Sequence, residues 1–325
     1  MKCDAPIRFF SEEQIERILT PQKTTAAMEA AFKRDYRQTI QMPLRTQMES
    51  SPGSLLLLMP CYDRALSAAG MKIVTVTTLT QVNADRIRAS FLLLDPDTGK
   101  VKAIMGANYL TDVRTAAVSA VATKLMSRPD ASILGVFGTG RQALAHVLVL
   151  SCVSEFSRIL VCGSSLSRSE EFAQQLWSRH KVKVEPVDNA TCASAADVIC
   201  TCTTSRTPLF DGGEVRDGTH LNLVGGFQPD TREVDSYLMR RARIVVDTYQ
   251  GALAEAGELL IPLRQGELAR ECISADLHEI ASGKKTPRSN PQEVTVFKSV
   301  GCAFQDLVIA KLVWDQLTKP SPRSS

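Results

Sequence analysis

A glycine turn between an apolar run and a helix-like segment constrains the fold of this chain more than any other feature. Residues 132–143 read SILGVFGTGRQA, and the helix-like stretch 144–153 follows directly. Gly138 permits a tight turn, Gly140 lets a pyrophosphate approach the backbone, and Ala143 lets helix and strand pack closely. The unpaired N–H groups and the positive dipole end of the helix would then hold the phosphates. The pattern predicts a dinucleotide-binding fold.

Short apolar runs alternate with helix-like segments in the part of the chain that follows this turn. The runs are four to six residues long and rich in β-branched residues, which is typical of parallel strands buried on both faces. We therefore expect a doubly wound α/β domain with a parallel sheet over residues of about 120–300. After the first strand, the expected strands are residues 158–162, 182–185, 197–202, 220–224 and 243–247.

The end of the second expected strand bears on which nicotinamide cofactor is bound. An Asp or Glu at that place commonly accepts hydrogen bonds from the adenosine ribose, which selects NAD. Residues 162–168 read CGSSLSR and contain no carboxylate, whereas Ser164 and Ser165 supply hydroxyl groups and Arg168 supplies a guanidinium. These groups are suited to a 2′-phosphate. The sequence favours NADP(H) and leaves NAD(H) open, because Arg168 is also explained as a solvated side chain.

Length, composition and charge narrow the class of protein. A chain of 325 residues, 44% hydrophobic and 22% charged, predicts a globular protein of two domains. The formal charge of +3 argues against a nucleic-acid partner, and no apolar run approaches the length that spans a membrane. Nine cysteines, several within expected strands, indicate buried thiols in a reducing cytoplasm. Residues 319–325 are expected to form a disordered tail.

Several other chemistries lack their sequence patterns. The four histidines show no pairing at metal-ligand spacing and Cys-x-x-Cys does not occur, so no metal site is expected. Gly-x-Ser-x-Gly and the P-loop pattern are absent as well, which argues against an α/β-hydrolase and a P-loop NTPase. Hydride transfer remains the leading chemistry.

Three cations occupy informative positions in the N-terminal third. Arg45 follows Pro43-Leu44, Lys72 lies within an apolar run, and Arg114 opens an expected helix over residues 112–120. A cation flanked by apolar residues in a strand is unfavourable unless it faces solvent or a binding site. From the residues alone, solvated or salt-bridged side chains explain these cations better than a site does. The other expected elements here are a helical segment over 11–38, broken near residue 21, and strands at 53–59, 69–78 and 89–94.

The chain resembles the ornithine cyclodeaminase/mu-crystallin family along nearly its whole length. The matching blocks follow one another in the family's order. They are PLR at 43–45, KIV at 72–74, LDPDTG at 94–99, RTAAVSA at 114–120, GTGRQA at 138–143, GGFQPDTRE at 225–233, EAGE at 255–258 and TVFKSVG at 295–301.

The resemblance implies a homodimer of two-domain subunits. A discontinuous first domain, residues 1–118 with the returning segment 303–325, would carry the substrate site and the dimer contacts, and residues 119–302 would form the Rossmann domain. Arg45 and Arg114 match the carboxylate-binding arginines of the family, and Lys72 matches its active-site lysine. The expected cofactor-binding residues are Gly138, Thr139, Gly140, Arg141, Gln142, Ser164, Ser165, Arg168, Thr203, Thr204, Val224, Gly225 and Ser299.

These residues imply a chemistry for substrates that carry a carboxylate beside an amine or imine carbon. Two arginines can hold the carboxylate in a fixed orientation, and Arg114 at a helix N-terminus would add the helix dipole. Lys72, close to two guanidinium groups, is expected to have a lowered pKa that suits proton exchange with an imine nitrogen.

The chain departs from the cyclodeaminases directly after its Gly225-Gly226 pair. Those enzymes have an acid/base aspartate there, whereas this chain has Phe227, which cannot transfer a proton. Asp230 could replace it only if the loop directs its carboxylate inward. The second departure is MGAN at 105–108, where many members have Asp-Gly.

We therefore expect an NAD(P)H-dependent reductase of a small cyclic ketimine or imino carboxylate, such as Δ1-pyrroline-2-carboxylate. The mu-crystallin type of member, which also lacks the aspartate, carries out this reduction. An alanine-like amino-acid dehydrogenase, an ornithine cyclodeaminase and a non-catalytic NADP-dependent binding protein stay open as alternatives.

Overall fold

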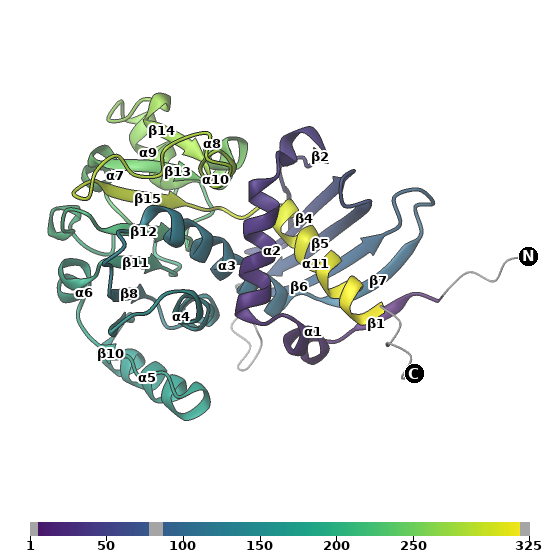
Figure 1. Cartoon of the computed structure of the whole chain (residues 1–325), viewed down its shortest axis with the longest axis horizontal. Helices are drawn as coiled ribbons and strands as arrows, with labels where there is room; N and C mark the ends of the chain where they lie inside the picture. Colours follow the sequence, from purple (N-terminus) through teal and green to yellow (C-terminus); the bar gives the residue numbers. More distant parts are fainter. Residues whose placement is uncertain (1–5, 78–86, 319–325) are drawn as a thin grey trace, which may run out of the picture. The chain divides into compact units, whose positions relative to one another are not determined.

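The computed structural model describes residues 6–77 and 87–318, which form two compact units (Figure 1). The first unit comprises Met1–Ala31, Asp35–Arg114 and Cys302–Ser325, and the second comprises Phe32–Arg34 and Thr115–Gly301. Thr78 of the expected strand 69–78 and the expected tail 319–325 lie outside the described residues.

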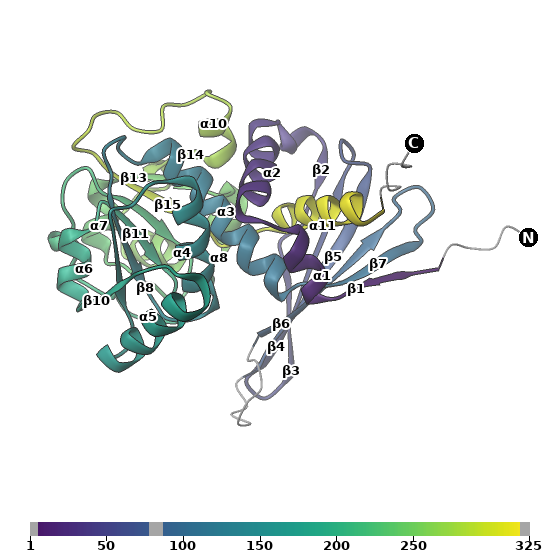
Figure 2. The same cartoon turned by 60° about the horizontal axis from the view of Figure 1, so that its bottom comes forward.

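The first unit is built on a seven-stranded sheet with the order β1-β7-β6-β5-β4-β2, in which β3 also pairs with β4. The β1–β7 pair is parallel and the other pairs are antiparallel. In Figure 2, α11 lies across the strands, and it contacts β4, β5 and β6. The elements are β1 (Arg8–Phe10), α1 (Glu12–Ile18), α2 (Pro21–Lys33), β2 (Ile40–Gln41), β3 (Thr46–Ser51), β4 (Ser54–Asp63), β5 (Ala68–Val76), β6 (Ile87–Leu94), β7 (Val101–Gly106) and α11 (Ala303–Thr318).

The strand register aligns the buried side chains of this sheet in rows beneath the helices. One row runs through Met59, Lys72, Phe91, Met105 and Phe10, all of them buried. Successive side chains of a strand point to opposite faces, so every member of this row lies on the same face. Lys72 therefore interrupts an otherwise apolar row on the helix-covered face.

Helix α3 (Asn108–Met126) begins earlier than the sequence analysis predicts. The Glu12 carboxylate accepts hydrogen bonds from the backbone N–H groups of Asn108 at 2.8 Å and Tyr109 at 3.0 Å. It thus satisfies two N–H groups that a helix start leaves unpaired and complements the positive dipole end. The prediction that Arg114 opens a helix is wrong. Arg114 lies in the second turn of α3, so the dipole argument does not apply to it.

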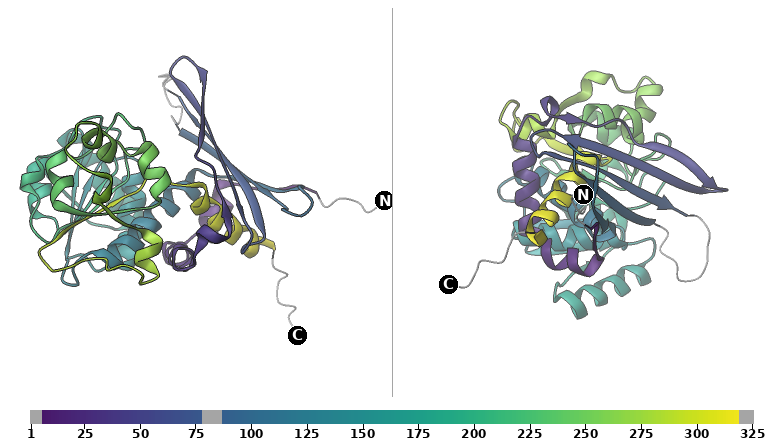
Figure 3. Two further views of the ribbon diagram at one scale, coloured as in Figure 1. Left: turned by 90° about the horizontal axis from the view of Figure 1, so that it is seen from above. Right: turned by 90° about the vertical axis from the view of Figure 1, so that its right-hand side faces the viewer.

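The second unit confirms the predicted doubly wound parallel sheet. Its eight strands have the order β10-β9-β8-β11-β12-β15-β13-β14 and pair in parallel throughout. Figure 3 shows helices on both faces. The elements are β8 (Ile133–Phe137), α4 (Arg141–Val153), β9 (Arg158–Cys162), α5 (Leu166–His180), β10 (Glu185–Pro186), α6 (Asn189–Ala195), β11 (Val198–Thr201), β12 (His220–Leu223), α7 (Ser236–Arg241), β13 (Ala242–Val246), α8 (Tyr249–Glu255), α9 (Gly257–Arg264), β14 (Ile273–Asp276), α10 (Leu277–Ala281) and β15 (Val294–Lys298).

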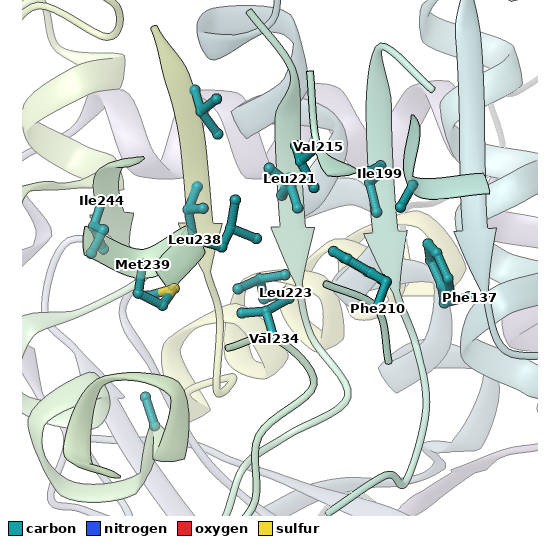
Figure 4. Close-up of a cluster of buried hydrophobic side chains, with 14 of the residues drawn as sticks. Phe137, Ile199, Phe210, Val215, Leu221, Leu223, Val234, Leu238, Met239 and Ile244 are labelled. Carbon is teal, nitrogen blue, oxygen red and sulfur yellow. The ribbon is translucent and has the colours of Figure 1, made fainter. Parts of the chain in front are cut away.

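Apolar side chains from adjacent strands form the core of this unit, together with those of the loops and helices that cover them. Phe137, Ile199, Leu221 and Leu223 lie on neighbouring strands and pack against Phe210 and other residues (Figure 4). Because parallel strands buried on both faces must be apolar on both, this cluster explains the uninterrupted hydrophobic runs in the sequence.

Two features of the sheet differ from the sequence prediction. The expected strand 182–185 is wrong, because only Glu185–Pro186 pair with β9, after Lys181 ends α5 in a left-handed conformation with φ 58°. Strands β14 and β15 were not predicted, and β15 lies between β12 and β13 although it is the last strand of the chain. Within the described residues, no helix combines the length and apolar character needed to cross a membrane.

Candidate functional site

Lys72, Arg114, Gln305 and Asp306 meet in the first unit, and we refer to these four residues as the cationic cluster. The Lys72 ammonium lies 2.8 Å from Asp306 Oδ2. Arg114 donates from Nε to Asp306 Oδ1 at 2.9 Å and from Nη1 to Gln305 Oε1 at 2.6 Å. All four residues are buried, with 5% exposure or less. The cluster joins β5, α3 and α11, which are distant in sequence.

The cationic cluster has more positive than negative charge. Burial lowers the pKa of Lys72 to about 8, Asp306 opposes this shift, and Arg114 and Arg45 lower the pKa further. Arg45 therefore acts electrostatically on Lys72, although its own side chain is only half-buried. Asp306 balances one cation only, so the cluster favours an anion, and a carboxylate matches the geometry of guanidinium donors.

Gln305 contributes a further donor to the cationic cluster. Its amide oxygen accepts from Arg114, while its Nε2 is buried without a hydrogen-bond partner among the described residues. Buried polar groups in folded proteins are normally hydrogen-bonded. An anion bound beside Arg114 would give this amide nitrogen an acceptor.

The glycine turn of the second unit has the shape that a pyrophosphate requires. Gly138 has φ 115°, and a side chain there would place its Cβ 2.6 Å from the Cys202 carbonyl oxygen. Gly140 is the N-cap of α4 and provides no side-chain cap, and a Cβ at Gly140 would have no heavy atom within 4 Å. The start of α4 is therefore open, and its N–H groups and dipole suit a phosphate. Arg141 and Gln142 form the first turn of α4.

The chain beyond β9 presents hydroxyl and guanidinium groups at the surface. Ser164, Ser165 and Arg168 are all exposed. Ser165 Oγ caps α5 by accepting from the Arg168 backbone N–H at 3.3 Å, which fixes the start of this helix. The Arg168 guanidinium thus lies in the first turn of α5, close in sequence to both hydroxyl groups.

The remaining expected cofactor-binding residues follow strands β11, β12 and β15, which are neighbours in the sheet. Thr203 and Thr204 follow β11, Val224 and Gly225 follow β12, and Ser299 follows β15. Because the strands are parallel, these residues meet at the carboxyl edge of the sheet, where ligands of open α/β sheets bind. The Ser299 hydroxyl is buried and donates to Asp247 Oδ2 at 2.9 Å.

Sequence reasoning missed several buried ionisable residues of the two units. Asp306 was not singled out, although an Asp within the apolar stretch 303–313 is a recognisable signal. Glu233, Glu258 and Lys298, which are buried in the second unit, were not identified either. Across the described residues, no group of three or more His, Cys, Asp or Glu side chains is placed to hold a metal ion.

Comparison with known proteins identifies the family. A model of the ornithine cyclodeaminase/mu-crystallin family matches residues 8–321. The chain belongs to this family. It is 34% identical to the ketimine reductase mu-crystallin of Mus musculus over 316 residues, which cover 96% of this chain and 97% of the relative.

Two solved structures of this family share the fold over nearly the whole chain. The Thermococcus litoralis Δ1-pyrroline-2-carboxylate reductase, in complex with NADH and L-proline, has a TM-score of 0.90 and 33% identity, covering 95% of this chain and 97% of that one. An archaeal alanine dehydrogenase dimer with bound NAD has a TM-score of 0.88 and 27% identity, covering 95% of each chain.

This family member carries no free carboxylate at either candidate position after its Gly225-Gly226 pair. Phe227 is half-buried and packs against the hydrophobic cluster of the second unit. Asp230 is exposed and forms an ion pair with Arg206. The Asp230 carboxylate is thus engaged by Arg206 at the surface of the second unit.

Proposed function

We propose that the protein is an NAD(P)H-dependent reductase of a small cyclic ketimine or imino carboxylate, with Δ1-pyrroline-2-carboxylate as the leading substrate. The cationic cluster carries this proposal, because it combines a surplus of buried positive charge with a lysine whose pKa is lowered to about 8. The reductase and ketimine reductase names of the relatives support it.

The residues of the chain have separate tasks in this reaction. Arg114 and Arg45 hold the substrate carboxylate and thereby orient the imine carbon. Lys72 has a pKa of about 8, so it is protonated at neutral pH and releases its proton more readily than an ordinary lysine. It donates this proton to the imine nitrogen. The open start of α4 holds the pyrophosphate of the cofactor, which supplies the hydride when bound.

We further propose NADPH as the preferred cofactor. Ser164, Ser165 and Arg168 are exposed together beyond β9, and residues 162–168 contain no carboxylate to repel a 2′-phosphate. Fluorescence titration with NADPH and NADH tests this preference. Tighter binding of NADH by about tenfold, or 1.4 kcal/mol, would contradict it.

A second copy of the chain is the proposed partner of the first unit. The face of its sheet opposite the helices (Figure 3) carries an apolar row of Pro60, Met71, Leu92, Ile104 and Phe9, of which Phe9 is 68% exposed. Exposed apolar patches of this kind mark protein interfaces. The dimeric alanine dehydrogenase of the family supports a second copy as the occupant. Sedimentation analysis should show a dimer, and Ile104→Glu should dissociate it.

The function is tested by incubating the purified protein with NADPH and a panel of cyclic ketimines, 2-oxo acids with ammonia, and ornithine with NAD(P)⁺. We expect oxidation of NADPH with the cyclic ketimine and little or no proline from ornithine, because Phe227 cannot carry the proton that amine departure requires. Phe227→Asp should introduce only a trace of that activity. Efficient proline formation by the unmodified protein would overturn the proposal, and cofactor binding without turnover would favour a binding protein.

A further inference from the structure

Three ionisable side chains are completely enclosed beneath the Gly225-Gly226 turn of the second unit. We refer to Glu233, Glu258 and Lys298 as the acidic cluster, because two carboxylates face one ammonium. Their exposures are 0%, 1% and 0%. Lys298 Nζ lies 2.9 Å from Glu258 Oε2 and donates to the Gly226 carbonyl oxygen at 2.6 Å.

Glu233 connects the loops that follow two neighbouring strands. Its Oε1 accepts from the backbone N–H and the hydroxyl group of Thr203, at 2.8 and 2.7 Å. Its Oε2 accepts from the Thr201 hydroxyl at 2.7 Å and from the Gly225 N–H at 2.9 Å. Thr203 follows β11 and Gly225 follows β12, so one carboxylate fixes the spacing of both loops.

The hydrogen bonds define the ionisation state in which Glu233 can perform this task. All four donors point to its two oxygens, and only an ionised carboxylate can accept from all of them. Burial and the neighbouring Glu258 raise the pKa of Glu233, while Lys298 and the two threonines lower it. Burying a charge is unfavourable unless hydrogen bonds and a nearby opposite charge stabilise it. Glu233 has four hydrogen bonds, and the positive charge of Lys298 favours its ionised form.

The glycines of the turn are adapted to this carboxylate. A side chain at Gly225 would collide with Glu233 and the Thr203 backbone, and a Cβ at Gly226 would lie 2.9 Å from a Glu258 oxygen. The turn therefore approaches the acidic cluster more closely than any residue with a side chain could. The position of the turn depends on the cluster, and the cluster is enclosed by the turn.

The sheet order indicates which half of the dinucleotide these loops receive. The pyrophosphate site follows β8, and the adenosine-ribose residues Ser164 and Ser165 follow β9 on one side of it. Strands β11 and β12 lie on the other side of β8. A dinucleotide bound across the carboxyl edge of the sheet therefore extends its nicotinamide half over the loops after β11 and β12.

We propose that Glu233 is a positioning residue for the nicotinamide half of the cofactor, acting through the Thr203 and Gly225 loops without touching the cofactor. This inference rests on the proposed function, because it assumes that the second unit binds NAD(P)H. Glu258 accepts a hydrogen bond from the Glu233 backbone N–H, and Lys298 donates one to the Gly226 carbonyl oxygen. Loss of the hydrogen bonds between Glu233 and these two loops should weaken binding of the nicotinamide half and leave binding of the adenosine half unchanged.

The test compares two ligands that differ in the nicotinamide half. Binding of NADPH and of 2′-phospho-ADP-ribose is measured by calorimetry for the unmodified protein and for Glu233→Gln, with NADH and ADP-ribose run in parallel. We expect Glu233→Gln to lose about tenfold in affinity for NADPH and less than about twofold for the fragment. The Gln amide keeps the side-chain volume but presents a donor where acceptors are needed.

Asp197→Asn is the matched control, because Asp197 is also buried and also joins two segments, but at the opposite edge of the same sheet. It accepts from the Ser132 and Ile133 N–H groups and pairs with Arg128 and Arg216. We expect a lowered melting temperature and unchanged affinities for both ligands. Thr201→Val removes one hydrogen-bond donor to Glu233 and replaces Glu233→Gln in the test if that variant does not fold. We expect it to lose about threefold in affinity for NADPH and to leave the affinity for the fragment unchanged.

Each outcome decides the proposal. Equal losses for NADPH and the fragment would show that Glu233 only supports the fold, and unchanged binding of both would show that it has no role. Failure of the unmodified protein to bind any dinucleotide would overturn the proposed function together with this inference. A selective loss in a protein that binds NADPH but reduces no imine would overturn the proposed substrate and leave the positioning role supported.

Discussion

The two buried ionic clusters of this protein have opposite charge balance. The cationic cluster of the first unit sets Lys72 and Arg114 against the single carboxylate of Asp306. The acidic cluster of the second unit sets Glu233 and Glu258 against Lys298. Both clusters are almost completely buried. In the protein interior, a charge that is not compensated is unfavourable.

The difference lies in how the surplus charge is compensated. In the acidic cluster, backbone N–H groups and threonine hydroxyls already provide four hydrogen bonds to Glu233. In the cationic cluster, the surplus positive charge and the unpartnered Gln305 amide nitrogen have no such internal partner among the described residues. A cluster whose charges and hydrogen-bonding groups have partners within the protein is suited to hold the backbone in place. A cluster with surplus charge and an unpartnered polar group is suited to bind a ligand.

The largest expected effect comes from removing the cation of the acidic cluster. Lys298→Met should lower the free energy of unfolding by about 3–5 kcal/mol, because two buried carboxylates then lack their counter-charge. Lys298 lowers the pKa of Glu233, so its loss raises that pKa further and the folded variant favours protonated Glu233. The destabilisation should therefore be greatest at high pH and shrink as the pH falls.

Urea unfolding of Lys298→Met and the unmodified protein, at about pH 6 and about pH 8, measures this effect. Lys311→Met, which removes the partly exposed partner of Asp315 on α11, is the control and should change stability by less than about 1 kcal/mol. Equal stability of Lys298→Met and the unmodified protein at both pH values would contradict the role given to the acidic cluster.

Substrate binding at the cationic cluster should fail when Arg114, or the neighbouring Arg45, is removed. We expect Arg114→Ala and Arg45→Ala to lose about 2–5 kcal/mol of transition-state stabilisation in kcat/KM for ketimine reduction, since the substrate carboxylate is left without its partner. NADPH affinity should stay nearly unchanged. Arg206→Ala, which removes the exposed partner of Asp230, is the control. A variant that retains near-native kcat/KM would show that its arginine does not hold the substrate.

The smallest effect is a shift of the pH profile. Ketimine reduction should decline as the pH rises through about 8, because Lys72 then loses the proton that it donates. Oxidation of the amino acid, the reverse reaction, needs deprotonated Lys72 and should rise over the same range. Asp306 raises the pKa of Lys72, so Asp306→Asn should move the pH profiles of both reactions to lower pH.

Steady-state rates of the two reactions across the pH range measure this shift. Asp315→Asn, on the same helix but paired with the partly exposed Lys311, should leave both profiles in place. Profiles that do not move in Asp306→Asn would assign the proton donor to a group other than Lys72.

Local patterns predicted much of the second unit. The strand, glycine turn and helix of residues 132–153 follow from sequence, because Gly138 needs a positive φ and apolar runs need burial on both faces. Errors occurred where a remote contact decides the local structure. Helix α3 starts at Asn108 because Glu12 caps it. The segment 182–184 stays outside the sheet although it alternates like a strand.

The sequence predicted only some residues of the candidate site. Lys72, Arg45 and Arg114 were found through a cation in an apolar strand and through family resemblance. Their acidic partner Asp306 lies 192 residues beyond Arg114, and no pattern of spacing connects the two. The same holds for Glu233, whose four hydrogen-bond donors belong to Thr201, Thr203 and Gly225, between 8 and 32 residues before it in the chain.

By itself, the sequence determined the elements that depend on near neighbours: the dinucleotide-binding turn, the helix that follows it and most of the apolar strands of the second unit. Only the tertiary structure decided which elements meet. It inserted β15 between β12 and β13, which brings Lys298 to Glu258, and it returned α11 to β5, which brings Asp306 to Lys72. Turns and strands follow from backbone sterics and burial over a few residues. Buried charges obtain their partners through long-range packing, which no local pattern specifies.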